Sequence, residues 1–326
     1  MASRSTFPQL ARPAKFILPA AGAPIAALVL ASLLWGTADV AGKLALAAVP
    51  PVTLAALRFV VALAILWPLA RRRGGPRAPM RVTAPLGLLG VALTFLLQNL
   101  GLDRTTATNA SLLQGASPIL ILLLAASVLG ERLGLRRIAA VGLAMAGVAA
   151  VTLSSSDGVR APGLGDALVL ASTGCFAAFV VLGRRAFPVY GTLPVLAGMA
   201  AWGSAALLPA AALELSLTSP GAIGPGEVAL VLYLGAGCSA LTYGLWGYAL
   251  GRLEAGRAAT FDTLIPVVGF LAAVVVLREA PLIWHIVGGV LVVAGVWIAI
   301  SEPHTSIQDS PDLAPEVRPA LGGEAV

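Results

Sequence analysis

The sequence predicts an all-α integral membrane protein whose ten transmembrane helices form two inverted five-helix repeats. Three observations lead to this prediction: an apolar composition, ten stretches of membrane-spanning length, and an internal duplication. The chain of 326 residues is 58% hydrophobic and only 11% charged, with mean hydropathy +0.92, whereas a soluble domain carries about 25% charged residues. So few charges suit a surface that faces lipid, and the net charge of +6 therefore gives no reason to expect a nucleic-acid partner.

Ten apolar stretches have the ~20 residues that a helix needs to cross a bilayer core about 30 Å thick. They are residues 25–48, 51–70, 82–103, 105–129, 138–155, 164–187, 191–213, 227–251, 255–277 and 282–301. We expect the first to be a membrane helix and not a cleaved leader, because it continues through Leu46 and many similar stretches follow. The polar tails, 1–24 and 302–326, lack the apolar content of a core and are expected to be disordered.

Positive charges are concentrated in alternate loops. Of the 21 Lys and Arg residues, 16 fall on one side of the predicted topology, whereas Arg104, Arg160 and Arg278 fall on the other and Lys43 and Arg58 lie inside spans. Positively charged loops are retained on the cytoplasmic side during insertion. Both tails are therefore predicted to be cytoplasmic.

An internal repeat is visible in the sequence. The string ALVLAS occurs at 27–32 and again at 167–172. An ungapped shift of 148 residues also lays 107–154 over 255–302 and aligns Pro118 with Pro266, Glu131 with Glu279, and Gly147 with Gly295. Matched Pro, Glu and Gly in one register are harder to obtain by chance than matched Ala, Leu and Val.

The duplication divides the apolar part of the chain into two repeats, 25–155 and 164–301, with five predicted spans each. Because five is odd, the second repeat must cross the membrane in the opposite direction. Inverted repeats recur in secondary transporters, whose substrate site lies near the bilayer midplane between the halves. The architecture thus predicts a carrier that works by alternating access.

Three segments resemble the EamA-type family of the drug/metabolite transporter superfamily, and the resemblance runs from about residue 25 to 301. They read WGTADVAGKLALAAVPPVTLAALRF, TATNASLLQGASPILILLLAASVLGERL and LYLGAGCSALTYGLWGYALGRLEAGRAATFDTLIPVVGFLAAVVVLREAP. The resemblance implies a bacterial inner-membrane carrier of ten helices in two inverted halves that exports metabolites or drugs. The family usually has Asn-Phe after its Trp-Gly-Ser/Thr start, where this chain has Ala38 and Asp39.

Gln114 and Asp262 occupy equivalent positions of the repeat, each four residues before a proline. Pro118 and Pro266 cannot donate to the carbonyls of these residues, so each is expected to kink its helix and free a carbonyl beside a polar side chain. Both sites approach the midplane, where inverted repeats meet. Asp262 is the predicted proton-coupling residue and Gln114 a candidate for the substrate pathway. The alternative is an ordinary proline kink in which Gln114 bonds a neighbour.

Other polar residues extend the candidate pathway. Thr108 and Ser111 share a face with Gln114, although packing of small residues explains them equally well. Glu131 and Glu279 lie at loop edges and are expected to bond helix ends or nearby Arg residues.

Two further pairs complete the candidates. Asp39 and Lys43 are four residues apart in the first span and can pair on one helix face, with Arg58 at a depth similar to that of Lys43. The alternative is a structural ion network in which Lys43 and Arg58 snorkel outward. Tyr243 and Trp246, one turn apart, could stack on a solute or simply pack.

The predicted function is a secondary active transporter that exports a small metabolite, amino acid or drug by proton antiport. The mixed charges of Asp39, Asp262, Lys43 and Arg58 suit a small zwitterion such as an amino acid. The alternatives are a facilitated, uncoupled carrier, a channel, and an intramembrane enzyme with an Asp39–Asp262 dyad.

An enzyme is not expected, because no HExxH or GxSxG motif or paired-His signal is present. With two His, two Cys and no metal-ligand spacing, neither a metal nor a cofactor is expected. The expected partners are the solute, the lipid bilayer and protons, and the oligomeric state is left open.

Overall fold

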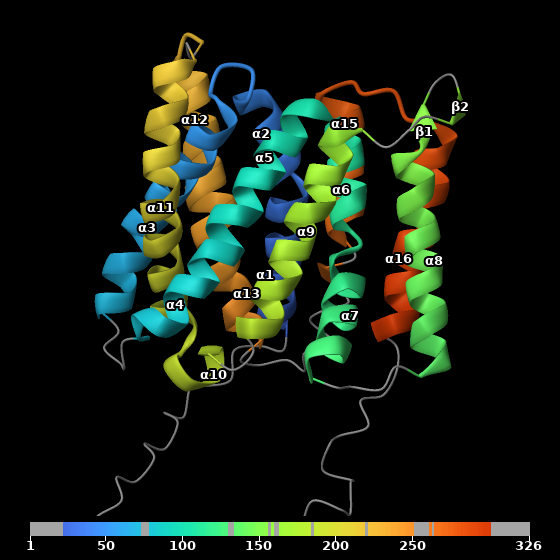
Figure 1. Cartoon of the computed structure of the whole chain (residues 1–326), viewed down its shortest axis with the longest axis horizontal. Helices are drawn as coiled ribbons and strands as arrows, with labels where there is room; N and C mark the ends of the chain where they lie inside the picture. Colours follow the sequence, from blue (N-terminus) through green and yellow to red (C-terminus); the bar gives the residue numbers. More distant parts are fainter. Residues whose placement is uncertain are drawn as a thin grey trace, which may run out of the picture.

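The computed structural model shows a bundle of long helices whose axes run roughly side by side (Figure 1). It describes residues 22–72, 78–129, 134–155, 158–159, 163–183, 186–218, 221–250, 261–262 and 264–300. Residues 1–21 and 302–326 of the predicted tails, Glu131 and most of the loop residues with positive charge lie outside these ranges, whereas residues 22–24 of the predicted N-terminal tail belong to the first helix.

The elements of the first half begin with a helix that is interrupted at Thr37. In chain order they are α1 (Gly22–Gly36), α2 (Ala38–Ala45), α3 (Pro51–Arg72), α4 (Met80–Gly87), the π-helical segment η1 (Leu88–Leu93), α5 (Thr94–Arg104), α6 (Ala107–Gln114), α7 (Ser117–Leu129) and α8 (Leu135–Thr152). Within the described residues, strands are confined to a short antiparallel hairpin of β1 (Ser154–Ser155) and β2 (Gly158–Val159).

The second half follows the hairpin. Its elements are α9 (Leu164–Gly183), α10 (Ala186–Tyr190), α11 (Thr192–Leu217), α12 (Pro225–Leu232), the π-helical segment η2 (Tyr233–Leu241), α13 (Thr242–Leu250), α15 (Leu264–Val276) and α16 (Ile283–Ile300). The start of α1 and the end of α16 lie at one end of the bundle, and the β1–β2 hairpin lies at the other (Figure 1).

Seven helical stretches in the described chain are long and apolar enough to cross a membrane. They are Gly22–Ala45, Pro51–Arg72, Met80–Arg104, Ala107–Ser127, Leu164–Gly183, Thr192–Leu217 and Pro225–Ala249. Shorter apolar helices cover Ile138–Val151, Leu264–Val276 and Ile283–Ile298. The prediction of an all-α membrane protein with many spans is confirmed, whereas ten spans in two inverted halves remain a proposal.

The predicted span 105–129 is interrupted. α6 ends at Gln114, the chain makes a turn at Gly115 and Ala116, and α7 begins at Ser117. Pro118 is thus the second residue of a helix, a position at which its missing N–H group is not needed. Pro266 is the third residue of α15, and residue 263 before it lies outside the described part.

Helices α8 and α16 meet through equivalent contacts. A Cβ atom on Gly147 would lie 2.6 Å from the carbonyl oxygen of Gly288, and one on Gly295 would lie 2.7 Å from that of Ala140. A shift of 148 residues converts Ala140 to Gly288 and Gly147 to Gly295. The two contacts are therefore the same contact seen from each helix, as in an isologous interface.

Two further glycines, related by the same shift, also pack against backbone carbonyls of neighbouring helices. Gly87 packs against the backbone carbonyl of Met199 in α11, and Gly235 packs against that of Arg58 in α3. Gly87 and Gly235 are again 148 residues apart. Glycine permits this approach because a Cβ atom would lie 2.6 and 2.7 Å from those oxygens, respectively.

Candidate substrate and coupling site

A buried carboxylate lies just after the break in the first helix. Asp39 is 5% exposed and accepts three hydrogen bonds: from Gln98 Nε2 at 2.9 Å, from Ser111 Oγ at 3.0 Å and from Gln114 Nε2 at 2.7 Å. Gln98 also donates to Gln114 Oε1 at 3.2 Å. We call these four residues the Asp39 cluster. Helices α2, α5 and α6 therefore meet around one charge whose hydrogen-bond donors are all neutral.

A buried guanidinium lies on the neighbouring helix α3. Arg58 is 4% exposed, and its Nε donates to Ser239 Oγ at 2.7 Å while one Nη donates to the Cys238 carbonyl at 3.5 Å. Its charge lies over the ring of Phe95, 4.3 Å from the centroid, a favourable cation–π contact. The alternative in which Arg58 snorkels to the surface is wrong, because the side chain is enclosed by helices.

Among the described residues, neither of these charges forms an ion pair. Between described residues, the structure contains one ion pair, which joins Asp103 and Arg104 at 3.8 Å. Asp39 and Asp262 are likewise not hydrogen-bonded to one another, so the described structure contains no aspartyl dyad. A buried charge without a counter-ion is costly, and in a membrane protein it commonly marks a solute or ion pathway.

An aromatic pair lies beside the Cys238 carbonyl that Arg58 contacts. Trp35 Nε1 donates to the Cys238 carbonyl at 3.0 Å, and the ring of Tyr243 lies edge-on to Trp35 with centroids 5.3 Å apart. A cavity of about 10 Å³ is bounded by Phe59, Ser239, Tyr243 and apolar residues of α3, η1 and α11. That space is about enough for one water, so a solute can occupy it only after the helices separate.

Helix α5 connects the two charged sites. Phe95 contacts Arg58, and Gln98 donates to Asp39. Residues three apart on a helix share a face and are separated by a rise of about 4.5 Å. The anionic and cationic sites are thus neighbours along α5.

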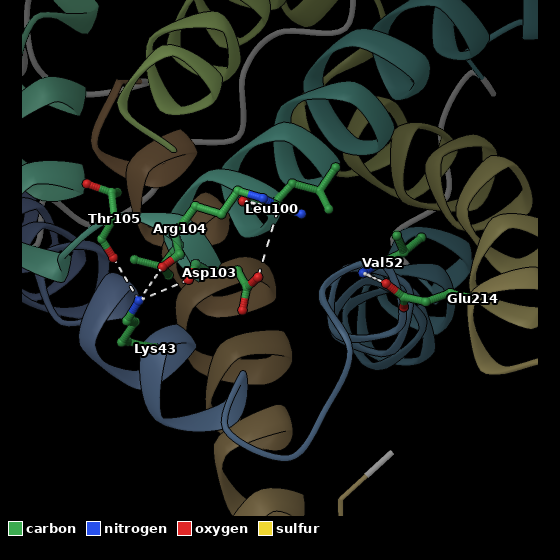
Figure 2. Close-up of polar contacts among 8 residues, drawn as sticks. Lys43, Val52, Leu100, Asp103, Arg104, Thr105 and Glu214 are labelled. Carbon is green, nitrogen blue, oxygen red and sulfur yellow. Dashed lines mark hydrogen bonds and ion pairs between the residues drawn. The ribbon is translucent and has the colours of Figure 1, made fainter. Parts of the chain in front are cut away.

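Lys43 makes other contacts than the predicted pairing with Asp39. Its Nζ donates to the carbonyls of Leu102 at 2.6 Å and Thr105 at 2.7 Å, as Figure 2 shows at the end of α5. A cation at this position satisfies carbonyls that the helix leaves unpaired and interacts favourably with the helix dipole. The predicted pairing with Asp39 is wrong, because Lys43 is directed to the end of another helix.

Two carboxylates cap the starts of helices. Glu279 accepts from the backbone N–H groups of Ala107 and Thr108, both at 2.9 Å, which confirms that it bonds a helix end. Glu214 accepts from the backbone N–H of Val52 at 3.1 Å (Figure 2). Both contacts tie a helix of the first half to a residue of the second.

The remaining candidates make no hydrogen bond with Asp39 or Arg58 in the described part. Asp262 is partly buried and makes no hydrogen bond or ion pair with another described residue, and the carbonyl of Phe261 before it accepts from Ser32 Oγ at 2.9 Å. Thr108 is 1% exposed, and its hydroxyl has no partner in the described part. Trp246 packs with residues of α1 and α13 and with Phe261.

Sequence reasoning missed four residues of the site: Gln98, Phe95, Ser239 and Trp35. Gln98 carries a usable signal, since an amide in an otherwise apolar span needs a partner. The others carry none, because phenylalanine, serine and tryptophan are ordinary residues of membrane helices. Their importance comes from contacts between helices that are distant in the sequence.

Many apolar spans that enclose an anionic and a cationic side chain define a polytopic membrane protein of the transporter class. Residues 23–153 and again residues 163–301 match the EamA-like transporter family, and the chain belongs to this family. Membership agrees with the predicted resemblance and with the expectation that the protein is not an enzyme.

Several relatives match over most of their lengths. An Archaeoglobus fulgidus protein named "Uncharacterized transporter" is 31% identical and covers 85% of this chain and 97% of the relative. An Escherichia coli protein named "Probable amino-acid metabolite efflux pump" is 30% identical, covering 83% and 93%. A Streptantibioticus cattleyicolor protein named "Probable terminal-alkyne amino-acid exporter" is 33% identical, covering 83% and 91%.

Proposed function

We propose that the protein is a secondary active transporter that exports small zwitterionic metabolites of the amino-acid class by proton antiport. Arg58 binds the solute carboxylate, and Asp39 binds its ammonium group. The carrier has ten spans in two inverted halves and lies in the bacterial inner membrane with both termini in the cytoplasm.

One observation carries the substrate class: among the described residues, Asp39 and Arg58 are buried charges that hydrogen-bond neutral groups only and form no ion pair. Burying an ion pair is rarely a net gain in stability, and burying two unpaired charges is worse. A zwitterion offers each of them the counter-ion that the protein does not supply. The names of the Escherichia coli and Streptantibioticus cattleyicolor relatives, both of which refer to amino-acid export, point to the same class.

Equivalent contacts support the inverted architecture. The paired contacts of α8 with α16 are reproduced by a shift of 148 residues, and the same shift relates Gly87 to Gly235, each of which packs against a backbone carbonyl of a neighbouring helix. The family matches the chain twice, once in each half. The predicted side with 16 of the 21 positive residues supports the assignment of the cytoplasmic face.

The lining of the small cavity suggests which amino acids to test. Apart from Ser239 and the phenol of Tyr243, its residues are apolar, among them Phe59, Val91 and Leu196. Apolar side chains should therefore be preferred. Leucine and phenylalanine are suitable probes, each with its decarboxylated amine (isoamylamine, phenethylamine) and its deaminated acid (4-methylpentanoate, 3-phenylpropanoate).

The experiment is counterflow in liposomes that contain the purified protein. We expect saturable exchange of leucine or phenylalanine, weaker exchange of each amine and acid, and accumulation of the amino acid when a pH difference is imposed. Strong exchange of cationic dyes with none of these amino acids would overturn the zwitterion proposal. Exchange without accumulation under a pH difference would identify an uncoupled carrier.

A further inference from the structure

The π-helical segment η2 supplies two of the groups that hold Arg58. Ser239 accepts from Arg58 Nε, and the carbonyl of Cys238 accepts from an Arg58 Nη and from the indole of Trp35. In an α-helix, the Cys238 carbonyl would accept from the backbone N–H of Thr242, four residues on. The π-register releases this carbonyl for side chains of α1 and α3.

Thr242 stabilises that register. Backbone N–H groups at the end of η2 donate to the carbonyls of Gly237 and Ser239. The carbonyl of Cys238, which lies between them in the sequence, does not accept either of these bonds. The hydroxyl of Thr242 donates to the same Gly237 carbonyl at 2.8 Å, and the residue is 0% exposed. This second bond, to the carbonyl five residues back, favours π pairing over the α pairing that would occupy Cys238.

The first half contains the same hydrogen bond from a threonine hydroxyl to the carbonyl five residues back, but it lies beside no guanidinium in the described part. Thr94 donates through its hydroxyl to the Leu89 carbonyl at 2.7 Å, and N–H groups at the end of η1 donate to the carbonyls of Leu89 and Val91. Thr94 and Thr242 are 148 residues apart, as are Leu89 and Gly237. Both are buried and make the same bond, but among the described contacts η1 provides no polar group to Arg58.

We propose that Thr242 is a positioning residue for substrate binding. By holding η2 in its π-register, it presents the Cys238 carbonyl and the Ser239 hydroxyl to one side of the Arg58 guanidinium. A guanidinium has five N–H groups, and these two contacts use two of them. The other three N–H groups of Arg58 then face the solute carboxylate. This inference rests on the proposed function, in which Arg58 binds that carboxylate.

The test compares Thr242→Val with Thr94→Val in liposome counterflow of leucine and isoamylamine. Valine keeps the branched shape of threonine and removes the hydroxyl. Thr242→Val should raise the KM for leucine roughly five- to tenfold, the effect of about one lost hydrogen bond, and leave that for isoamylamine unchanged. Thr242→Ser keeps the hydroxyl and should restore the KM, and Thr94→Val should leave the ratio of the two KM values as in the wild type.

A second variant addresses folding. Ser239→Ala removes the other contact of η2 with Arg58 and should shift the same ratio, even if Thr242→Val yields no folded protein. Equal shifts for leucine and isoamylamine, or equal effects of Thr242→Val and Thr94→Val, would overturn the inference. So would an unchanged ratio in Ser239→Ala.

The proposed function can fail separately. A wild-type protein that exchanges neither leucine nor phenylalanine would overturn the proposed function itself. A wild-type protein whose leucine exchange depends on Arg58 but is indifferent to Thr242 and Ser239 would overturn only the positioning role.

Discussion

Arg58 offers the most direct test of how the solute is bound. Arg58→Gln removes the buried charge and the planar fork of donors but leaves a neutral amide that can reach toward Ser239. Hydrogen bonds to charged groups contribute about 1.5–3 kcal/mol, and 1.4 kcal/mol corresponds to a factor of about ten. If Arg58 binds the solute carboxylate, the KM for leucine should therefore rise about 10- to 100-fold. The KM for isoamylamine, which has no carboxylate, should not rise.

The matched control is Arg58→Lys, which keeps the positive charge but loses the fork that now bonds Ser239 and lies over Phe95. An ammonium is a compact point charge and does not replace bidentate recognition, so we expect an intermediate KM for leucine. Saturation curves from counterflow give the KM values, and membrane yield and thermal stability report folding. A folded Arg58→Gln protein with a wild-type KM for leucine would refute the assignment. Loss of folded protein in both variants would support a structural role instead.

Three other substitutions separate the remaining roles. Asp39→Asn should raise the KM for leucine in counterflow and leave the KM for 4-methylpentanoate unchanged, because only leucine carries an ammonium group. Equal effects on both KM values would count against ammonium binding by Asp39. Lys43→Met should lower the free energy of unfolding by about 1 kcal/mol, because the C-terminal end of α5 loses its cation. The readout is a lower unfolding temperature. A change in the KM for leucine above twofold would indicate instead that Lys43 takes part in substrate binding. Asp262→Asn should abolish accumulation driven by a pH difference and preserve exchange; accumulation that persists would show that the proton is carried elsewhere, with Asp39 as the first rival.

The fold class could be predicted because the bilayer restricts what a chain can do. A spanning segment needs about 20 apolar residues and must satisfy its own backbone, which leaves the helix as the natural solution. The predicted stretches 51–70 and 191–213 correspond to α3 and α11, with ends that differ by at most a few residues. The break after Gln114 is harder to predict. The sequence does not show whether a proline is the second residue of a new helix or lies in the middle of a continuous one.

The site could be predicted only in part, because its contacts join distant helices. Asp39, Ser111 and Gln114 were candidates on separate grounds, and the structure unites them through Gln98. Lys43 was placed with Asp39 from their spacing alone. The partner of Lys43 depends on where the end of α5 lies. The spacing of Asp39 and Lys43 within one helix contains no information about the position of α5.

The two π-helical segments show why the halves of this protein can be alike in structure and different in chemistry. Each segment passes over one carbonyl, that of Gly90 in η1 and that of Cys238 in η2, and these residues are related by the repeat. Only the second meets a cation, because Arg58 lies on the helix that packs against Gly235, whereas Met199 lies on the one that packs against Gly87. The two segments can thus give both halves the same means of bending, while the residues packed beside them, Arg58 in one case and Met199 in the other, place a charge beside only one of them. The proposed carrier needs both properties, since its two halves would exchange conformations around a solute that has two different ends.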